Sequence, residues 1–273
     1  MTLHSESFAS GNRDAHPLSL LHGVTRCGLD FSPLIASLTT RFHVTTVDLR
    51  GHGGSARADS YLVRDYVEDI VALVRSFERP CVLFGHSLGA MAALGAAAAE
   101  PSGIRAIILE DPPLETMGRR IGETPWRALF SAMRAIAEAG GSVRDVTERL
   151  GNIEVRNTDG RVACLRELRD AASLRYSASA LLRMDPQLLT PVIDGCWLDG
   201  FDAERAARQV QCPALLLQAD PDCGGALTHS DADMLSTAIR DCTRLTFARC
   251  GHQVHAMETQ RVLNVVHAFA SSL

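Results

Sequence analysis

The sequence contains no lysine, so all 27 of its Lys-plus-Arg residues are arginines. A Schiff-base lysine, a phosphate-loop lysine and a lysine general base are therefore excluded. Aromatic residues make up only 5% of the chain, and acids outnumber arginines to give a net charge of -5. This composition disfavours nucleic acid as a partner, because nucleic-acid binding relies on basic patches and often on aromatic stacking surfaces.

The chain also lacks C-x-x-C pairs, an apolar signal segment at its amino end and any apolar run near the roughly 20 residues that span a bilayer. Cys250, His252 and His255 stand close together, but no fourth ligand has a suitable spacing. We therefore expect a cytoplasmic protein with unpaired cysteines, no metal, no cofactor and no membrane partner. The sequence leaves the oligomeric state open.

Short apolar runs alternate with helical patterns in the first half of the 273-residue chain. Each run is nearly continuous, as expected for strands of a parallel sheet that is covered on both faces. The runs lie at residues 18–21, 43–49, 81–84 and 104–109. Residues 63–77 repeat apolar positions with a helical period, and residues 88–99 are small and apolar. This alternation predicts an α/β fold with a mostly parallel, doubly wound sheet.

The pattern changes after Pro112-Pro113. Residues 124–210 show helix signals and no convincing strand, with a polar turn expected at 152–160 and a helix at 161–176. Two further strand runs and a last amphipathic helix follow residue 213. We therefore expect a sheet domain interrupted by a helical cap, with residues 1–113 and 211–273 in the sheet domain and residues 114–210 in the cap.

The segment Gly85-His86-Ser87-Leu88-Gly89 is the strongest chemical signal. It follows an apolar strand run and precedes an apolar helix. Glycines at both ends permit a tight turn in which backbones approach closely, and this turn lifts the serine hydroxyl above the edge of the sheet. The context predicts that Ser87 is a nucleophile, which needs a neighbouring base.

His252 is the predicted base, because it follows the last strand at the same sheet edge as Ser87. His255 is a nearby competitor. The base needs an orienting acid. Three aspartates follow strands and reach the same edge: Asp220, Asp222 and Asp111. The residue pattern alone does not choose among them.

The predicted reaction also needs donors for a developing oxyanion. Gly23-Val24 leaves an early strand, so the backbone N–H groups of Val24 and Leu88 can converge there. Leu88 begins a helix, whose amino end favours negative charge. The sequence therefore predicts an oxyanion hole formed by these two N–H groups.

The predicted cap supplies the candidate substrate-binding residues. Trp126, Phe130 and Trp197 all lie in it, and such a lining suits an apolar substrate of modest size. Four arginines also lie there, and for these we expect an exposed helix face rather than contact with a substrate carboxylate: Arg119, Arg120, Arg127 and Arg134.

Four motifs, in this order, resemble the α/β-hydrolase superfamily, and the resemblance covers essentially the whole chain. They are Leu21-His22-Gly23, Asp48-Leu49-Arg50-Gly51-His52-Gly53-Gly54-Ser55, Gly85-His86-Ser87-Leu88-Gly89 and Gly251-His252. The resemblance implies Ser87 as the nucleophile, His252 as the base and Asp222 as the acid, although Ala219 stands where a glycine usually ends the strand before it. Some relatives, including fungal zearalenone-lactone hydrolases, carry the acid after the strand that follows the nucleophile, which implies Asp111 as the alternative.

The expected function is cofactor-free hydrolysis of a carboxylic ester or lactone through an acyl-enzyme. The substrate would be a small, apolar to moderately polar carbonyl compound. A serine nucleophile disfavours the dehalogenase and epoxide-hydrolase branches, which use a carboxylate. The same scaffold leaves open a C–C bond hydrolase or lyase, and also a non-catalytic binding protein.

Overall fold

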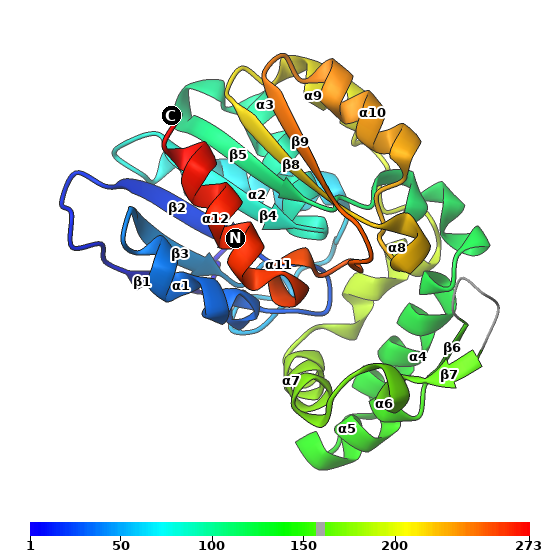
Figure 1. Ribbon diagram of the computed structural model, residues 1–273. Coiled ribbons are helices and arrows are strands. Elements are labelled where there is room, and N and C mark those ends of the chain that lie inside the picture. Colours follow the sequence, from blue (N-terminus) through cyan, green and yellow to red (C-terminus); the bar gives the residue numbers. More distant parts are fainter. Residues whose placement is uncertain (157–161) are drawn as a thin grey trace.

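The computed structural model describes residues 1–156 and 162–273, and the described chain is built around one large sheet (Figure 1). Its strands are β1 (Ser5–Phe8), β2 (His16–Leu21), β3 (Phe42–Val47), β4 (Cys81–His86), β5 (Ile104–Glu110), β8 (Ala214–Ala219) and β9 (Cys242–Phe247). They are ordered β1-β3-β2-β4-β5-β8-β9, and all neighbours are parallel except β1 and β3. The predicted α/β fold with a doubly wound, mostly parallel sheet is confirmed.

Helices cover both faces of this sheet. One face packs against α1 (Ser32–Leu38) and α12 (Thr259–Ala270), and the other against α2 (Val63–Arg75), α3 (Leu88–Ala99), α9 (Ala203–Gln209) and α10 (His229–Ala238). Alternate residues of β4 serve the two layers, since Leu83 lies in one apolar cluster while Val82 and Phe84 lie in the other. This two-sided burial explains the continuous apolar runs.

The chain reverses its direction of travel across the sheet between β2 and β4. From β2 it moves outward to β3, and it then crosses back to β4 on the other side of β2. In open α/β sheets, ligands bind in the crevice at the carboxyl ends of strands at such a reversal. The loops after Leu21 and His86 leave the sheet at this crevice.

A helical insertion lies between β5 and β8 and projects from the sheet edge (Figure 1). Its helices are α4 (Trp126–Ala139), α5 (Val143–Gly151), α6 (Leu165–Leu168), α7 (Ala171–Leu182) and α8 (Thr190–Ile193). The helix α4 has a strongly amphipathic sequence, and it buries Leu129, Phe130 and Met133 on one side. That buried side faces the carboxyl edge of the sheet.

The insertion differs from the sequence expectation in three places. It contains a small antiparallel pair, β6 (Glu154–Arg156) and β7 (Val162–Cys164), where no strand was expected; residues 157–161 of the expected turn and helix lie outside the described residues. The expected helix at 161–176 is divided, because the Asp170 side chain accepts the Ser173 N–H and starts α7 anew. The helix α9 packs against α3, so this end of the expected cap belongs to the layer that covers the sheet.

Two further elements follow β9: the short helix α11 (Val254–Met257) and then α12. Within the described parts of the chain, no helix combines the length and the apolar character needed to cross a bilayer.

Candidate active site

Ser87 occupies a sharp turn between β4 and α3. Its φ of 54° and ψ of -114° are strained values for a residue with a side chain. A Cβ atom at Gly85 would lie 2.1 Å from the Gly89 carbonyl oxygen, and one at Gly89 would lie 2.0 Å from that of Leu21. The two glycines are therefore required for strand, turn and helix to pack this closely.

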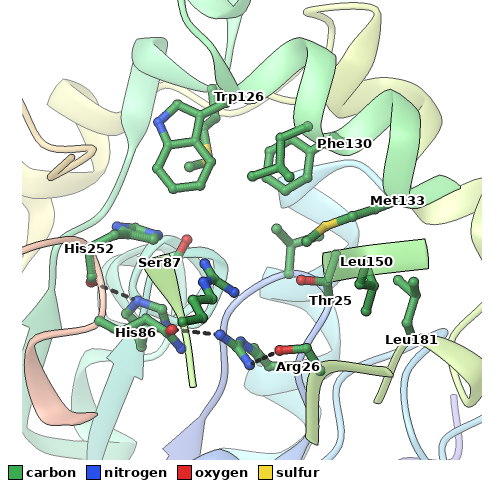
Figure 2. Close-up of a pocket in the computed structure, with 16 residues that line it drawn as sticks. Thr25, Arg26, His86, Ser87, Trp126, Phe130, Met133, Leu150, Leu181 and His252 are labelled. Atoms are coloured by element: carbon green, nitrogen blue, oxygen red, sulfur yellow. Dashed lines mark hydrogen bonds between the residues drawn. The ribbon is translucent and has the colours of Figure 1, made fainter. Parts of the chain in front are cut away.

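The Ser87 hydroxyl is buried and faces a cavity of about 60 Å³ that His252 also lines (Figure 2). Among the residues that the structure describes, Ser87 Oγ has no hydrogen-bond partner. A buried hydroxyl without a partner is uncommon in folded proteins and is typical of a functional position.

The imidazole ring of His252 interacts with the carboxylate of Asp111. The distance between His252 Nδ1 and Asp111 Oδ2 is 2.6 Å. Asp111 is fully buried and also accepts N–H bonds from Ala219, Ala226 and Leu227. A carboxylate fixed by three backbone donors orients the imidazole, so that Nδ1 faces Asp111.

The structure therefore pairs His252 with the alternative acid, Asp111, and not with Asp222. Asp222 lies exposed in the 3-10 helix Pro221–Cys223, just beyond the end of β8. Asp220 accepts N–H bonds from Asp222 and Arg249 and so shapes this loop. The pairing with Asp111 follows from its position in the chain. Asp111 directly follows β5 with a φ of 46°, which places its carboxylate beneath the loop that carries His252.

His255, the competing base, is buried away from the cavity. Its Nδ1 lies 2.9 Å from both Glu110 carboxylate oxygens, and its Nε2 lies 3.6 Å from Asp30 Oδ2. Burial alone would lower the pKa of His255, but Glu110 and Asp30 raise it to about 10. A charged histidine with both nitrogens facing carboxylates is unsuited to accept a proton.

The predicted oxyanion donors lie beside Ser87. Leu88 is the first residue of α3, and Val24 lines the cavity beside Ser87. Within the described residues, neither backbone N–H donates a hydrogen bond to the protein. A Cβ atom at Gly23 would lie 2.8 Å from His86 Nδ1 and 3.2 Å from Ser87 Cβ, so glycine permits this close approach.

Two buried histidines of the motifs brace the turn around Val24. His22 Nε2 accepts the Leu49 N–H at 2.9 Å, and His52 Nε2 accepts the Thr25 N–H at 3.3 Å. Burial lowers the pKa of both, that of His52 to about 3, so both rings are neutral acceptors. The segment after β3 therefore fixes the turn after β2.

Of the predicted aromatic lining, the structure brings Trp126 and Phe130 to the cavity but not Trp197 (Figure 2). The Trp126 ring stacks against Phe130 at 5.9 Å between centroids and meets His252 edge-on at 5.4 Å. Trp197 is fully buried in the apolar cluster between the sheet and its helices, and its backbone carbonyl accepts the Val63 N–H. The turn at Asp194-Gly195, where Gly195 has a φ of 74°, precedes Trp197 in the chain.

Sequence reasoning missed the polar part of the cavity. Arg26, Arg169 and Ser177 line it together with Thr25 and Gln253. These residues come from the loops after β2 and β9 and from the insertion, and no motif connects them in sequence. A wider cavity of about 500 Å³ adjoins the first and shares Trp126, Arg169 and His252 with it, which provides an approach from outside.

Comparison with known proteins agrees with this architecture. The profile of the alpha/beta hydrolase family matches residues 20–265. A pimeloyl-[acyl-carrier protein] methyl ester esterase from Xanthomonas oryzae is 29% identical over 94% of this chain and 95% of its own. A 2-(acetamidomethylene)succinate hydrolase from Mesorhizobium japonicum is 41% identical, but the match spans only 37% of this chain and 38% of that protein.

Solved structures share the fold at low sequence identity. The enol-lactonase from Burkholderia xenovorans LB400 has a TM-score of 0.73 and 16% identity, covering 98% of this chain and 96% of that one. The family profile spans most of the sequence, from the strand before the Val24 turn to the last helix. The chain therefore belongs to the alpha/beta hydrolase family.

Proposed function

We propose that this protein is a serine hydrolase that cleaves a carboxylic ester or lactone through an acyl-enzyme. The nucleophile is Ser87, the base is His252 and the orienting acid is Asp111. The observation that carries the proposal is the placement of the Ser87 hydroxyl and the His252 ring on one cavity, with Asp111 Oδ2 2.6 Å from His252 Nδ1.

In the first half of the reaction, His252 Nε2 takes the Ser87 proton while Oγ attacks the carbonyl carbon. The carbonyl oxygen becomes an anion that accepts the N–H groups of Val24 and Leu88. Collapse of this intermediate breaks the ester bond, and the imidazolium donates its proton to the leaving alkoxide. Asp111 stabilises the imidazolium throughout.

In the second half, His252 removes a proton from water, which attacks the acyl carbon. The same two N–H groups hold the second oxyanion, and the proton returns to Ser87 Oγ as the acid leaves. With a lactone substrate, the alcohol and the acid belong to one product molecule.

The relatives support the choice of an oxygen ester. One relative aligned over most of both chains is a methyl ester esterase, and one similar structure is an enol-lactonase. Both names describe hydrolysis of an ester or lactone, which is the reaction that we propose for Ser87.

The test combines a covalent probe with turnover. A fluorophosphonate should label wild-type protein at Ser87, located by peptide mass spectrometry, and should not label Ser87→Ala. That variant should keep its fold by circular dichroism, and it should lose on the order of 10⁴- to 10⁶-fold in kcat on simple methyl and p-nitrophenyl esters. Near-native turnover by Ser87→Ala would overturn the proposal.

The same experiment separates the alternatives. Labelling at Ser87 with no ester or lactone turnover, but with cleavage of a chromogenic dienoate, would indicate a C–C bond hydrolase. Absence of both labelling and turnover would indicate a binding protein that keeps the fold.

A further inference from the structure

Among the residues that the structure describes, two guanidinium groups and no carboxylate side chain line the cavity beside Ser87. Arg26 comes from the loop after β2, and Arg169 lies between α6 and α7 of the insertion. Most of the remaining lining is apolar, with Trp126, Phe130 and Met133 on the opposite side (Figure 2). Cations withdrawn from water are costly unless an anion joins them.

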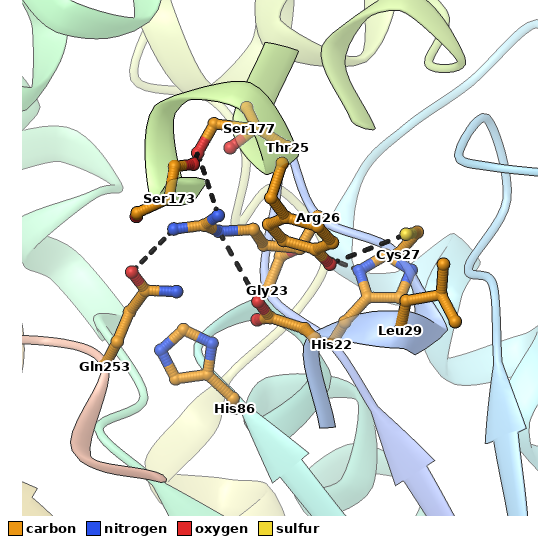
Figure 3. Close-up of polar contacts among 12 residues, drawn as sticks. His22, Gly23, Thr25, Arg26, Cys27, Leu29, His86, Ser173, Ser177 and Gln253 are labelled. Carbon is orange, nitrogen blue, oxygen red and sulfur yellow. Dashed lines mark hydrogen bonds and ion pairs between the residues drawn. The ribbon is translucent and has the colours of Figure 1, made fainter. Parts of the chain in front are cut away.

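Arg26 already has partners. It is 7% exposed, its Nη1 donates to Ser177 Oγ at 3.1 Å, and its Nη2 donates to Gln253 Oε1 at 2.6 Å (Figure 3). Its Nε lies 3.9 Å from Asp30 Oδ1. These contacts fix the guanidinium in place and leave its charge only partly balanced, because Asp30 also faces His255.

Arg169, in contrast to Arg26, has no hydrogen-bond or ion-pair partner among the described residues. Among the described residues, no carboxylate lies within 4.0 Å of its guanidinium, and its side chain makes no hydrogen bond. The adjacent acid, Asp170, is occupied at the start of α7, where it accepts the Ser173 N–H. Burial and the charge of Arg26 lower the pKa of Arg169 and the charge of Asp30 partly opposes them, with a net pKa of about 10, so the group remains charged at neutral pH.

The charges of this cluster, in which Arg169 is half-buried, do not balance. Arg26, Arg169 and His255 are three cations, and Asp30 and Glu110 are the two carboxylates among them. Asp111 is a separate case, because it is paired with His252. One further negative charge would neutralise the cluster, and the cavity at Arg169 is the place where it can enter.

We propose that Arg169, beside Arg26, binds a carboxylate on the acyl part of the substrate. The substrate class is then a half-ester of a dicarboxylic acid, or a lactone that carries a free carboxylate, with the scissile carbonyl at Ser87. This proposal rests on the proposed function and narrows its substrate. A guanidinium and a carboxylate form strong charge-assisted hydrogen bonds in an apolar site, which would select and orient such a substrate.

The test compares charged and uncharged methyl esters of equal chain length. Monomethyl succinate, glutarate and adipate are assayed against methyl butyrate, valerate and hexanoate by acid release. Wild-type protein should prefer the best half-ester in kcat/KM. Arg169→Met should lose on the order of 10²-fold on that half-ester and change little on its uncharged partner, and Arg169→Lys should restore part of the loss.

Arg127→Met is the matched control, because Arg127 is an exposed arginine of the same insertion. It should leave the ratio between the two esters unchanged. Absence of a half-ester preference in wild-type protein, or an equal loss by Arg169→Met on both esters, would overturn the proposal and assign Arg169 a structural role.

A binding measurement separates this proposal from the proposed function. Ser87→Ala should bind the free dicarboxylate of the best chain length by calorimetry, and Ser87→Ala with Arg169→Met should not. If Ser87→Ala binds the dicarboxylate but the wild-type protein hydrolyses no ester or lactone, the proposed hydrolase activity is refuted and the carboxylate site is retained. Fluorophosphonate labelling and turnover of uncharged esters, without dicarboxylate binding, would refute the carboxylate site alone.

Discussion

Two carboxylate–histidine pairs lie side by side at the carboxyl edge of the sheet, and they face different environments. Glu110 and Asp111 are consecutive residues at the end of β5, and their partners His255 and His252 are three residues apart. Asp111 meets one nitrogen of His252, whose ring reaches the cavity. Glu110 and Asp30 face both nitrogens of His255, which is 1% exposed.

The difference shows how one pairing can serve two purposes. A histidine with one free nitrogen at a cavity can exchange a proton with a substrate. A histidine enclosed by two carboxylates is held as a cation and links the elements around it. His86 lies between them, with ring centroids 4.6 Å from His252 and 5.2 Å from His255. Burial lowers the pKa of His86 well below its usual value, so a neutral ring separates the two pairs.

The largest expected effect comes from breaking the pair at the cavity. Asp111→Asn should keep the shape of the site but favour the wrong imidazole tautomer, which lowers kcat by about 10⁴-fold. Asp222→Asn is the control and should change kcat by less than about twofold, because Asp222 is exposed beyond β8. Kinetics on one ester, with folding checked by circular dichroism, measures both. An inactive Asp222→Asn beside an active Asp111→Asn would reverse the assignment.

Breaking the buried pair should instead affect stability. Glu110→Gln leaves the His255 cation without its nearest carboxylate and should lower the free energy of unfolding by about 3–5 kcal/mol. The exposed pair Arg75–Glu100 supplies the control, and Glu100→Gln should cost less than about 1 kcal/mol. Urea unfolding of both variants checks this. Equal stabilities would show that the buried pair contributes no more than an exposed one.

The two pairs should also respond differently to pH. The pKa of His255 is raised from 6.5 in the unfolded chain to about 10 in the folded protein. Its contribution to stability is therefore complete below pH 6.5 and is lost as the pH rises towards 10. Urea midpoints measured across this window should fall in wild-type protein. They should fall less in His255→Gln, which cannot titrate there; parallel curves for the two proteins would contradict the assignment.

Much of the fold followed from local patterns in the sequence. The strand runs and the helix periods report burial on both sheet faces, and these predicted the α/β fold correctly. The family was predicted correctly from the resemblance of the four motifs. The hairpin Glu154–Arg156 with Val162–Cys164 was missed because strands of three residues leave no measurable alternation. The packing of Ala203–Gln209 on α3 was missed because helical periodicity does not say which surface a helix covers.

The site was harder to predict where it depends on tertiary placement. Ser87 and His252 stood out because each occupies a loop at the carboxyl edge of a strand, and their roles remain predictions. The choice between Asp111 and Asp222 depends on where the His252 ring points, which no local pattern encodes. Arg26 and Arg169 are 143 positions apart in the sequence and line one cavity only because the insertion folds back over the sheet edge.

The smallest expected effect concerns the aromatic neighbours of the two histidines. Phe31 stacks on His255 with centroids 4.7 Å apart, whereas Trp126 meets His252 edge-on from the insertion. Trp126→Leu keeps an apolar side chain but removes part of the cavity wall. It should raise KM by about three- to tenfold on an uncharged ester, with kcat changed by less than about threefold, because it loses only part of the contact area of one side chain.

Trp197→Phe is the control for this last comparison, because it changes the other tryptophan of the chain at a position that does not line the cavity. It should lower the melting temperature through imperfect packing and leave KM unchanged. Steady-state kinetics and thermal unfolding of the two variants provide the measurement. If Trp126→Leu changed kcat and left KM unchanged, the ring would act by positioning His252. Trp126 would then belong with the catalytic residues and not with the apolar residues that contact the substrate.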